Sequence, residues 1–193
     1  MKAQKTSKMV FVSLGVVINL VLAQVPMHLK LPFFLDVIGT IVISALAGPW
    51  MGALTGLVTN LVLGLQNPIW IPYALVQISI GLSVGFLAQR GAFKSYGGLA
   101  LVAFVVWLIS QLTAIPITIV IFGGTSGSGS SFITLYLLAV GQRLWEAVLT
   151  TTLITESVDK IISVIIAYGL IQALPQRLRS QTPLGHLYTH HSD

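Results

Sequence analysis

The chain has 193 residues, of which 55% are hydrophobic and only 8% are charged. Because soluble domains usually carry about 25% charged residues, this composition predicts an all-α integral membrane protein and argues against a soluble enzyme. The absence of cysteine excludes disulfides, thiolate metal sites and cysteine nucleophiles. The formal net charge of +5 is spread over the ends of apolar runs rather than over one basic face, so no nucleic-acid partner is expected.

The first apolar run, from Met9 to about Met27, is long enough to span a bilayer, because about 20 helical residues cross the hydrocarbon core. Within it, Gly15, Asn19 and Ala23 recur at intervals of four and share one helix face. Small residues at this spacing let another helix approach closely. Two interpretations remain open for this face, namely packing within the chain or contact with a partner.

The next region, residues 35–67, is predicted to form a membrane hairpin. Two short apolar arms, 37–47 and 51–65, are joined by a tight Gly-Pro-Trp turn at residues 48–50. Each arm is short for a full span. We therefore expect the arms to tilt or to be shielded by neighbouring helices.

Polar residues stand at the open ends of this hairpin. Asp36 precedes the first arm, where it either caps the following helix or faces a bound solute. Asn60 lies inside the second, apolar arm and therefore needs a buried partner. Gln66 and Asn67 end that arm before Pro68, because the residue before a proline is disfavoured in helical geometry.

Two further spans are predicted at residues 71–88 and 99–122, joined by a basic loop at 89–94. Gly81 and Gly85 give the first of them a close-packing face. A flexible glycine-serine segment, GGTSGSGSS, follows from residue 123. No GK[ST] sequence follows it, so a phosphate-binding loop is not expected.

The segment 132–153 is difficult to place, because Arg143 and Glu146 offset its apolar residues in the free energy of insertion. We expect it to pack on protein, line a cavity or lie at the interface, and its interfacial, re-entrant or spanning state stays open. The final span is predicted at 155–174. Two pairs have helical spacing for mutual neutralisation, namely Arg143 with Glu146 and Glu156 with Lys160.

The basic residues predict the topology through the positive-inside rule. Six spans with both termini cytoplasmic place seven of the ten Lys and Arg residues inside, leaving Lys30, Arg143 and Lys160 outside. Counting 132–153 as a seventh span would move two C-terminal arginines outside. The expected organisation is a single transmembrane domain over 1–179 and a polar, disordered tail over 180–193.

In this topology, polar and aromatic residues that are costly in lipid converge on the outer side. Trp70 and Trp145 are candidates for stacking on a planar solute, although Trp70 and Tyr73 also suit a membrane-interface anchor. No HExxH, Ser-His-Asp or Walker motif is present, so we expect no enzyme, no cofactor and no bound metal. The candidate substrate-binding residues are Asp36, Asn60, Gln66, Asn67, Trp70, Tyr73, Gln142, Arg143, Trp145 and Glu146.

Several stretches resemble the substrate-binding S components of energy-coupling factor (ECF) transporters. They are the small-residue first helix, LPFFLDVIGT, GPWMGALTGLVTN and ESVDKIISVIIAYGLIQALP. The resemblance implies a six-helix protein in a prokaryotic plasma membrane that captures a vitamin or related micronutrient beneath its outer loops. It also implies a transmembrane coupling protein and two ATPase subunits as partners. Gly15, Asn19 and Ala23, in place of the family's Ala-x-x-x-Ala, would form the coupling-protein interface.

Two other functions fit the same pattern of spans. One is a ligand-sensing membrane domain, although no cytoplasmic output domain follows Arg179 in this sequence. The other is a small carrier that works without an ATPase. Both remain alternatives to the S-component interpretation.

Overall fold

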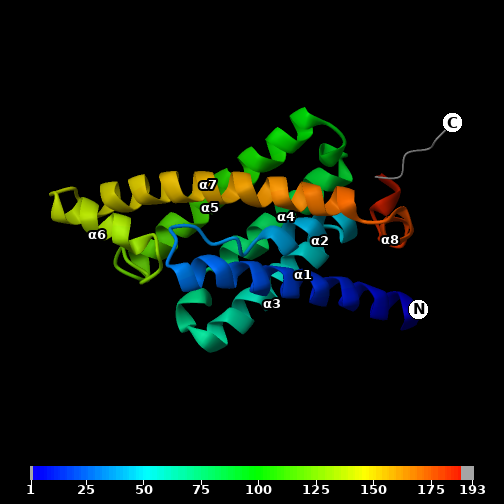
Figure 1. The fold of residues 1–193 in the computed structure, drawn as a ribbon, viewed down its shortest axis with the longest axis horizontal. Coiled ribbons are helices and arrows are strands. Elements are labelled where there is room, and N and C mark those ends of the chain that lie inside the picture. The colour runs from blue at the N-terminus through cyan, green and yellow to red at the C-terminus, as the bar shows by residue number, and fades with distance from the viewer. Residues whose placement is uncertain (1, 188–193) are drawn as a thin grey trace.

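The computed structural model describes residues 2–187, within which the chain is all-helical and contains no strand (Figure 1). Eight α-helices and three 3-10 turns make up this part of the chain. They are α1 (Lys2–Leu29), α2 (Ile38–Ala47), α3 (Pro49–Gln66), η1 (Pro68–Trp70), α4 (Ala74–Gln89), η2 (Ala92–Lys94), α5 (Tyr96–Val120), α6 (Ser131–Ala139), α7 (Leu144–Ala173), α8 (Gln176–Ser180) and η3 (Gly185–Leu187).

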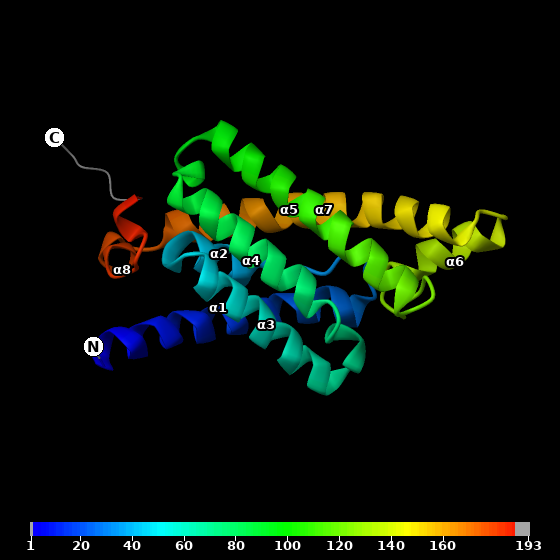
Figure 2. The same ribbon diagram turned by 180° about the vertical axis from the view of Figure 1, so that it is seen from behind.

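The helices form an elongated bundle with α1 and α7 running along its length (Figures 1 and 2). The start of α1, helix α8 and the α4–α5 connection lie toward one end, whereas α6 and the glycine-serine segment lie at the other. Helix α2 is central, and its residues are almost all buried. The core contains aliphatic side chains from α2, α4, α5 and α7, among them Ile41, Ile80, Val84, Val106 and Ala167.

Two helices, Met9–Leu29 and Tyr96–Val120, are long and apolar enough to cross a membrane. The six predicted spans correspond to α1, α2, α3, α4, α5 and α7. However, the 10 residues of α2 extend only about 15 Å, about half the hydrocarbon thickness. Six complete crossings and cytoplasmic termini therefore remain predictions.

The predicted hairpin is present as α2 and α3, with the turn at Gly48 and Pro49. Gly48 has φ +94°, a conformation that L side chains rarely adopt, and Pro49 starts α3 at a position where its missing N–H is harmless. Helix α4 packs closely on this hairpin. A Cβ at Gly81 would lie 2.5 Å from Ala53 N, and one at Gly85 would lie 2.2 Å from Pro49 Cα. The close-packing face predicted from these two glycines is confirmed.

The α1 face of Gly15, Asn19 and Ala23 is covered by the chain's own helices. Asn19 and Ala23 are fully buried, and a Cβ at Gly15 would lie 2.4 Å from a side chain of α2. Asn19 Nδ2 donates hydrogen bonds to Thr40 Oγ1 in α2 (2.9 Å) and Thr59 Oγ1 in α3 (3.0 Å). This corrects the proposed coupling-protein interface, because a partner would reach the face only by opening the bundle.

The segment predicted as 132–153 divides differently. Helix α6 ends at Ala139, the chain reverses at Gly141 with φ +93°, and α7 then runs unbroken through residue 154. The expected boundary between 153 and 155 is therefore wrong. A helix of 30 residues extends about 45 Å, so α7 is longer than the hydrocarbon core is thick.

The C-terminal region also differs from the expected disordered tail over 180–193. Residues 181–187 form turns and η3, and the backbone N–H of Leu184 donates a hydrogen bond to Leu46 O at the end of α2 (2.9 Å). Thr182 is buried. Residues 188–193 lie outside the described part of the chain.

Candidate functional site

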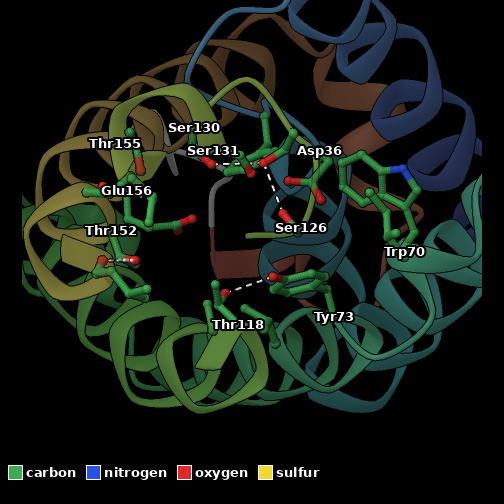
Figure 3. A pocket seen from close by; sticks show the side chains of 18 of the residues that line it. Asp36, Trp70, Tyr73, Thr118, Ser126, Ser130, Ser131, Thr152, Thr155 and Glu156 are labelled. Carbon is green, nitrogen blue, oxygen red and sulfur yellow. Dashed lines mark hydrogen bonds between the residues drawn. The ribbon is translucent and has the colours of Figure 1, made fainter. Parts of the chain in front are cut away.

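A cavity opens toward the α6 end of the bundle (Figure 3). Residues 34–37, the start of α4, the second half of α5, the glycine-serine segment, α6 and the first half of α7 all contribute side chains to it. About 70 Å³ is available to the centres of water-sized molecules, several times the volume that one water needs. The cavity therefore has room for several waters or a small solute.

A second, outer cavity of about 250 Å³ adjoins the first and shares Phe34, Ile69, Trp70 and Ser128 with it. The rings of Phe34 and Trp70 meet edge to face with centroids 6.0 Å apart. Because these side chains line both cavities, they form the boundary between this outer cavity and the first, inner one.

The floor of the inner cavity carries buried charges. Asp36 and Glu156 are each 6% exposed and Lys160 is 2% exposed. Lys160 Nζ lies 3.1 Å from Glu156 Oε2 and donates a hydrogen bond to Asp159 Oδ2. The predicted Glu156–Lys160 pair is therefore present. It is part of a larger cluster, because Asp159 from the next turn shares the same ammonium group.

Asp159 also fixes the non-helical segment between α1 and α2. Its Oδ1 accepts hydrogen bonds from the backbone N–H groups of Phe34 (3.0 Å) and Leu35 (2.8 Å). Leu35 has φ +52°, a sparsely populated conformation for a non-glycine residue. Non-helical backbone that is shielded from water needs such partners, because its N–H groups have no intrahelical acceptor. Asp159 thereby positions Phe34 and Asp36 at the cavity.

Asp36 faces the cavity and does not cap α2. The Nε2 of Gln77 donates to the Asp36 carbonyl oxygen (2.8 Å) and to its Oδ2 (3.1 Å). The N-cap residue of α2 is Val37, and no side chain caps the helix from that position. Gln77 Oε1 in turn accepts from Thr40 Oγ1 (2.8 Å), so Asn19, Thr40, Gln77 and Asp36 form one hydrogen-bonded chain.

The remaining walls combine aromatic rings with hydroxyl groups. Tyr73 stacks on Phe122 with centroids 5.6 Å apart, and its hydroxyl lies 2.8 Å from Thr118 Oγ1 (Figure 3). Opposite this pair, hydroxyls from the glycine-serine segment, α6 and α7 reach the cavity. They belong to Ser126, Ser128, Ser130, Ser131, Thr134, Thr151, Thr152 and Thr155.

Of the ten predicted binding residues, Asp36, Trp70 and Tyr73 line the inner cavity, and Asn67 lines the outer one. Asn60 is fully buried and lines neither, but its Nδ2 donates to Trp70 O (2.9 Å) and so holds η1 in place. Gln66 is exposed at the end of α3. Asn67 Oδ1 also accepts from Ile69 N at the start of η1 (3.2 Å).

Four predicted binding residues lie away from the cavity, at the tip where α6 turns into α7. Gln142 and Arg143 are in the turn, Trp145 is 54% exposed, and Glu146 Oε2 accepts from the backbone N–H of Arg143 (3.3 Å). None of the four lines either cavity. Their placement beside the pocket is therefore wrong, because the unbroken α7 carries its first turn beyond the cavity.

Sequence reasoning did not select Gln77, Thr118 or the α7 residues that face the cavity. A signal for Glu156 and Lys160 was present, because two charged residues in an apolar helix are functional candidates by default. Their helical spacing favoured mutual neutralisation, so neither residue was included among the candidate binding residues. Within the described residues, no group of three His, Asp or Glu side chains is placed to hold a metal ion.

No protein-family model matches this chain, and neither does any curated protein or solved structure. The functional assignment therefore depends on the residues and geometry described above.

Proposed function

We propose that the chain is a membrane-embedded solute-binding subunit, of the S-component type that its sequence resembles. It would capture a small micronutrient at the inner cavity. The observation that carries this proposal is the cavity itself, in which buried charges, hydroxyls and aromatic rings meet inside an apolar helical bundle. Such convergence of a few polar groups in an apolar pocket is typical of small-molecule sites.

The distribution of basic residues supports an outward-facing cavity. The α4–α5 connection, with Arg90 and Lys94, and helix α8, with Arg177 and Arg179, lie toward the end opposite the cavity (Figures 1 and 2). Under the positive-inside rule this basic end faces the cytoplasm. The resemblance to S components, rather than this charge distribution, is the reason for proposing a prokaryotic plasma membrane and six membrane-embedded helices.

The proposal includes partners because the resemblance to S components implies them, and the sequence itself has no Walker motif for ATP hydrolysis. A transmembrane coupling protein and two ATPases would supply the energy for release of the solute inside the cell. The buried face of Gly15, Asn19 and Ala23 is not available for this contact. The exposed face of α1, which includes Leu14, is the remaining surface of that helix.

Two measurements test the proposal. First, a thermal-shift screen of the purified protein against vitamins, nucleosides and cobalamins should find a stabilising solute. Trp70→Ala should weaken its affinity at least about tenfold, since truncating a buried aromatic anchor typically costs 2 kcal/mol or more. Trp145→Ala is the matched control and should change the affinity less than about twofold. The reverse order of effects would place the pocket at the α6–α7 tip.

Second, the tagged protein should co-purify with a transmembrane protein and two ATPases, and uptake of the solute should stop when the ATPase is inactivated. Uptake that continues without any ATPase would favour the self-sufficient carrier. Solute binding without uptake or ATPase partners would favour the sensing domain.

A further inference from the structure

The inner cavity carries more acidic than basic groups. Among its lining residues Asp36 and Glu156 are the acids and Lys160 is the base, and Asp159 adds a third carboxylate directly behind them. Lys160 already contacts both Glu156 and Asp159. Asp159 has two backbone donors as well, whereas the Asp36 carboxylate receives one hydrogen bond, from Gln77.

The two lining carboxylates reach the same space from different sides. Asp36 comes from the segment before α2 and Glu156 from α7, and Figure 3 shows both side chains directed into the opening between them. Removing an ion from water costs several kcal/mol unless an opposite charge and hydrogen bonds replace the solvent. One ammonium group that contacts Glu156 and Asp159, beside a third carboxylate on Asp36, leaves this requirement incomplete. A bound cation would complete it.

The other lining groups narrow the chemistry of that cation. Phe34, Trp70 and Tyr73 present aromatic surface, which attracts an organic cation through the ring quadrupole and stacks on a flat ring. The serine and threonine hydroxyls suit a solute with additional polar atoms. Within the described residues no three acidic or His side chains group as metal ligands, which favours an organic cation over a divalent metal ion.

We propose that the solute bound in this cavity is a small organic cation, namely a protonated amine or amidinium carried on a flat ring. Its N–H groups are held between Asp36 and Glu156, and its ring lies toward Trp70 and Tyr73. This inference rests on the proposed solute-binding function and names the charge class of the solute.

Three matched probes test the charge class directly with the full chain in detergent micelles. Benzylamine, benzyl alcohol and benzoate share one ring and differ in charge, and their affinities are measured by ligand-observed NMR. Benzylamine should bind at least about tenfold more tightly than benzyl alcohol, and benzoate should bind most weakly. Trp70→Ala gives the background from non-specific partition into the micelle.

Two substitutions and a control assign the selectivity to the cavity. Glu156→Gln and Asp36→Asn should each reduce the preference for benzylamine over benzyl alcohol at least about fivefold. Glu146→Gln removes the same charge from the same helix outside the cavity and should leave the preference unchanged. Glu156→Gln removes a charged partner of Lys160 and could fail to fold, which size-exclusion chromatography detects. In that case Asp36→Asn alone tests the selectivity.

Two results would overturn the inference. If benzyl alcohol or benzoate binds as tightly as benzylamine and Trp70→Ala abolishes that binding, the cavity takes a neutral or anionic solute and the proposed function stands. If no probe binds above the Trp70→Ala background, the cation class is also rejected, and the vitamin screen and the uptake assay decide the proposed function separately.

Discussion

Asn19 provides the sharpest test of how the bundle is held together. Helix α2 begins inside the protein and has no side-chain cap at its own N-cap residue. Asn19 Oδ1 accepts instead from Gly39 N (2.6 Å), one of the first-turn N–H groups that have no partner within a helix. Its Nδ2 donates to Thr40 and Thr59. One α1 side chain thus caps α2 and links it to α3.

Asn19→Ala should lower the free energy of unfolding by about 2–4 kcal/mol. The buried N–H of Gly39 is left unsatisfied, which costs about 1–3 kcal/mol. The two interhelical hydrogen bonds add about 0.6 kcal/mol each, the average found in membrane proteins. The hydroxyls of Thr40 and Thr59 keep their donor bonds to Gln77 Oε1 and Thr55 O, so they add no further orphaned donor.

Denaturant titration of the isolated protein in detergent measures this difference. Asn67→Ala is the control, because Asn67 is exposed and accepts a single local hydrogen bond from Ile69 N. It should change the free energy of unfolding by about 1 kcal/mol or less, the typical cost of losing one exposed cap. If Asn19→Ala were as stable as Asn67→Ala and lost only its association with a coupling protein, the internal role of Asn19 would be refuted.

Three further predictions concern packing and the charge cluster. Gly81→Leu should prevent folding because the new side chain would meet the α3 backbone. Gly169→Ala is the control, because the space around Gly169 is open. In the same titration its free energy of unfolding should be unchanged or higher by up to about 1 kcal/mol. Asp159→Ala should lower the free energy of unfolding by about 3–5 kcal/mol, since it leaves the buried ammonium group of Lys160 short of a partner. Asp159→Asn should lower it less, because its Oδ1 still accepts from the backbone of Phe34. Equal losses for the two variants would contradict this reasoning. Thr134→Val removes the buried hydrogen bond to Thr151 Oγ1 (3.0 Å) and should speed hydrogen exchange in α6, with unchanged exchange arguing against that contact.

Local patterns in the sequence were sufficient for the α2–α3 hairpin and its packing on α4. Gly48-Pro49 terminates one helix and starts the next through backbone preferences alone, and the spacing of Gly81 and Gly85 identifies a close contact. The boundary of α7 was not predictable in this way. Its run of threonines and charged residues has no strong breaker, and the true break depends on Gly141, which was interpreted as part of a longer segment.

The cavity required tertiary information. Asp36, Gln77 and Glu156 are 41 or more residues apart in the chain and meet only through the packing of α2, α4 and α7. Asn19 shows the related difficulty for polar residues on a helix face. Its pattern with Gly15 and Ala23 identifies a contact surface but does not distinguish a neighbouring helix of the same chain from a partner.

The charges of α7 explain why the cavity lies where it does. A lipid-facing helix would pay a high free-energy cost for Glu156, Asp159 and Lys160. In this chain they hold a segment whose backbone N–H groups have no helical partner. Asp159 binds the N–H groups of the non-helical backbone before α2, and that backbone carries Phe34 and Asp36. The shortness of α2 therefore has a structural purpose. Only a helix that began more than a full turn before Phe34 would satisfy those N–H groups internally, and such a helix would replace the non-helical segment that brings Phe34 and Asp36 to the cavity.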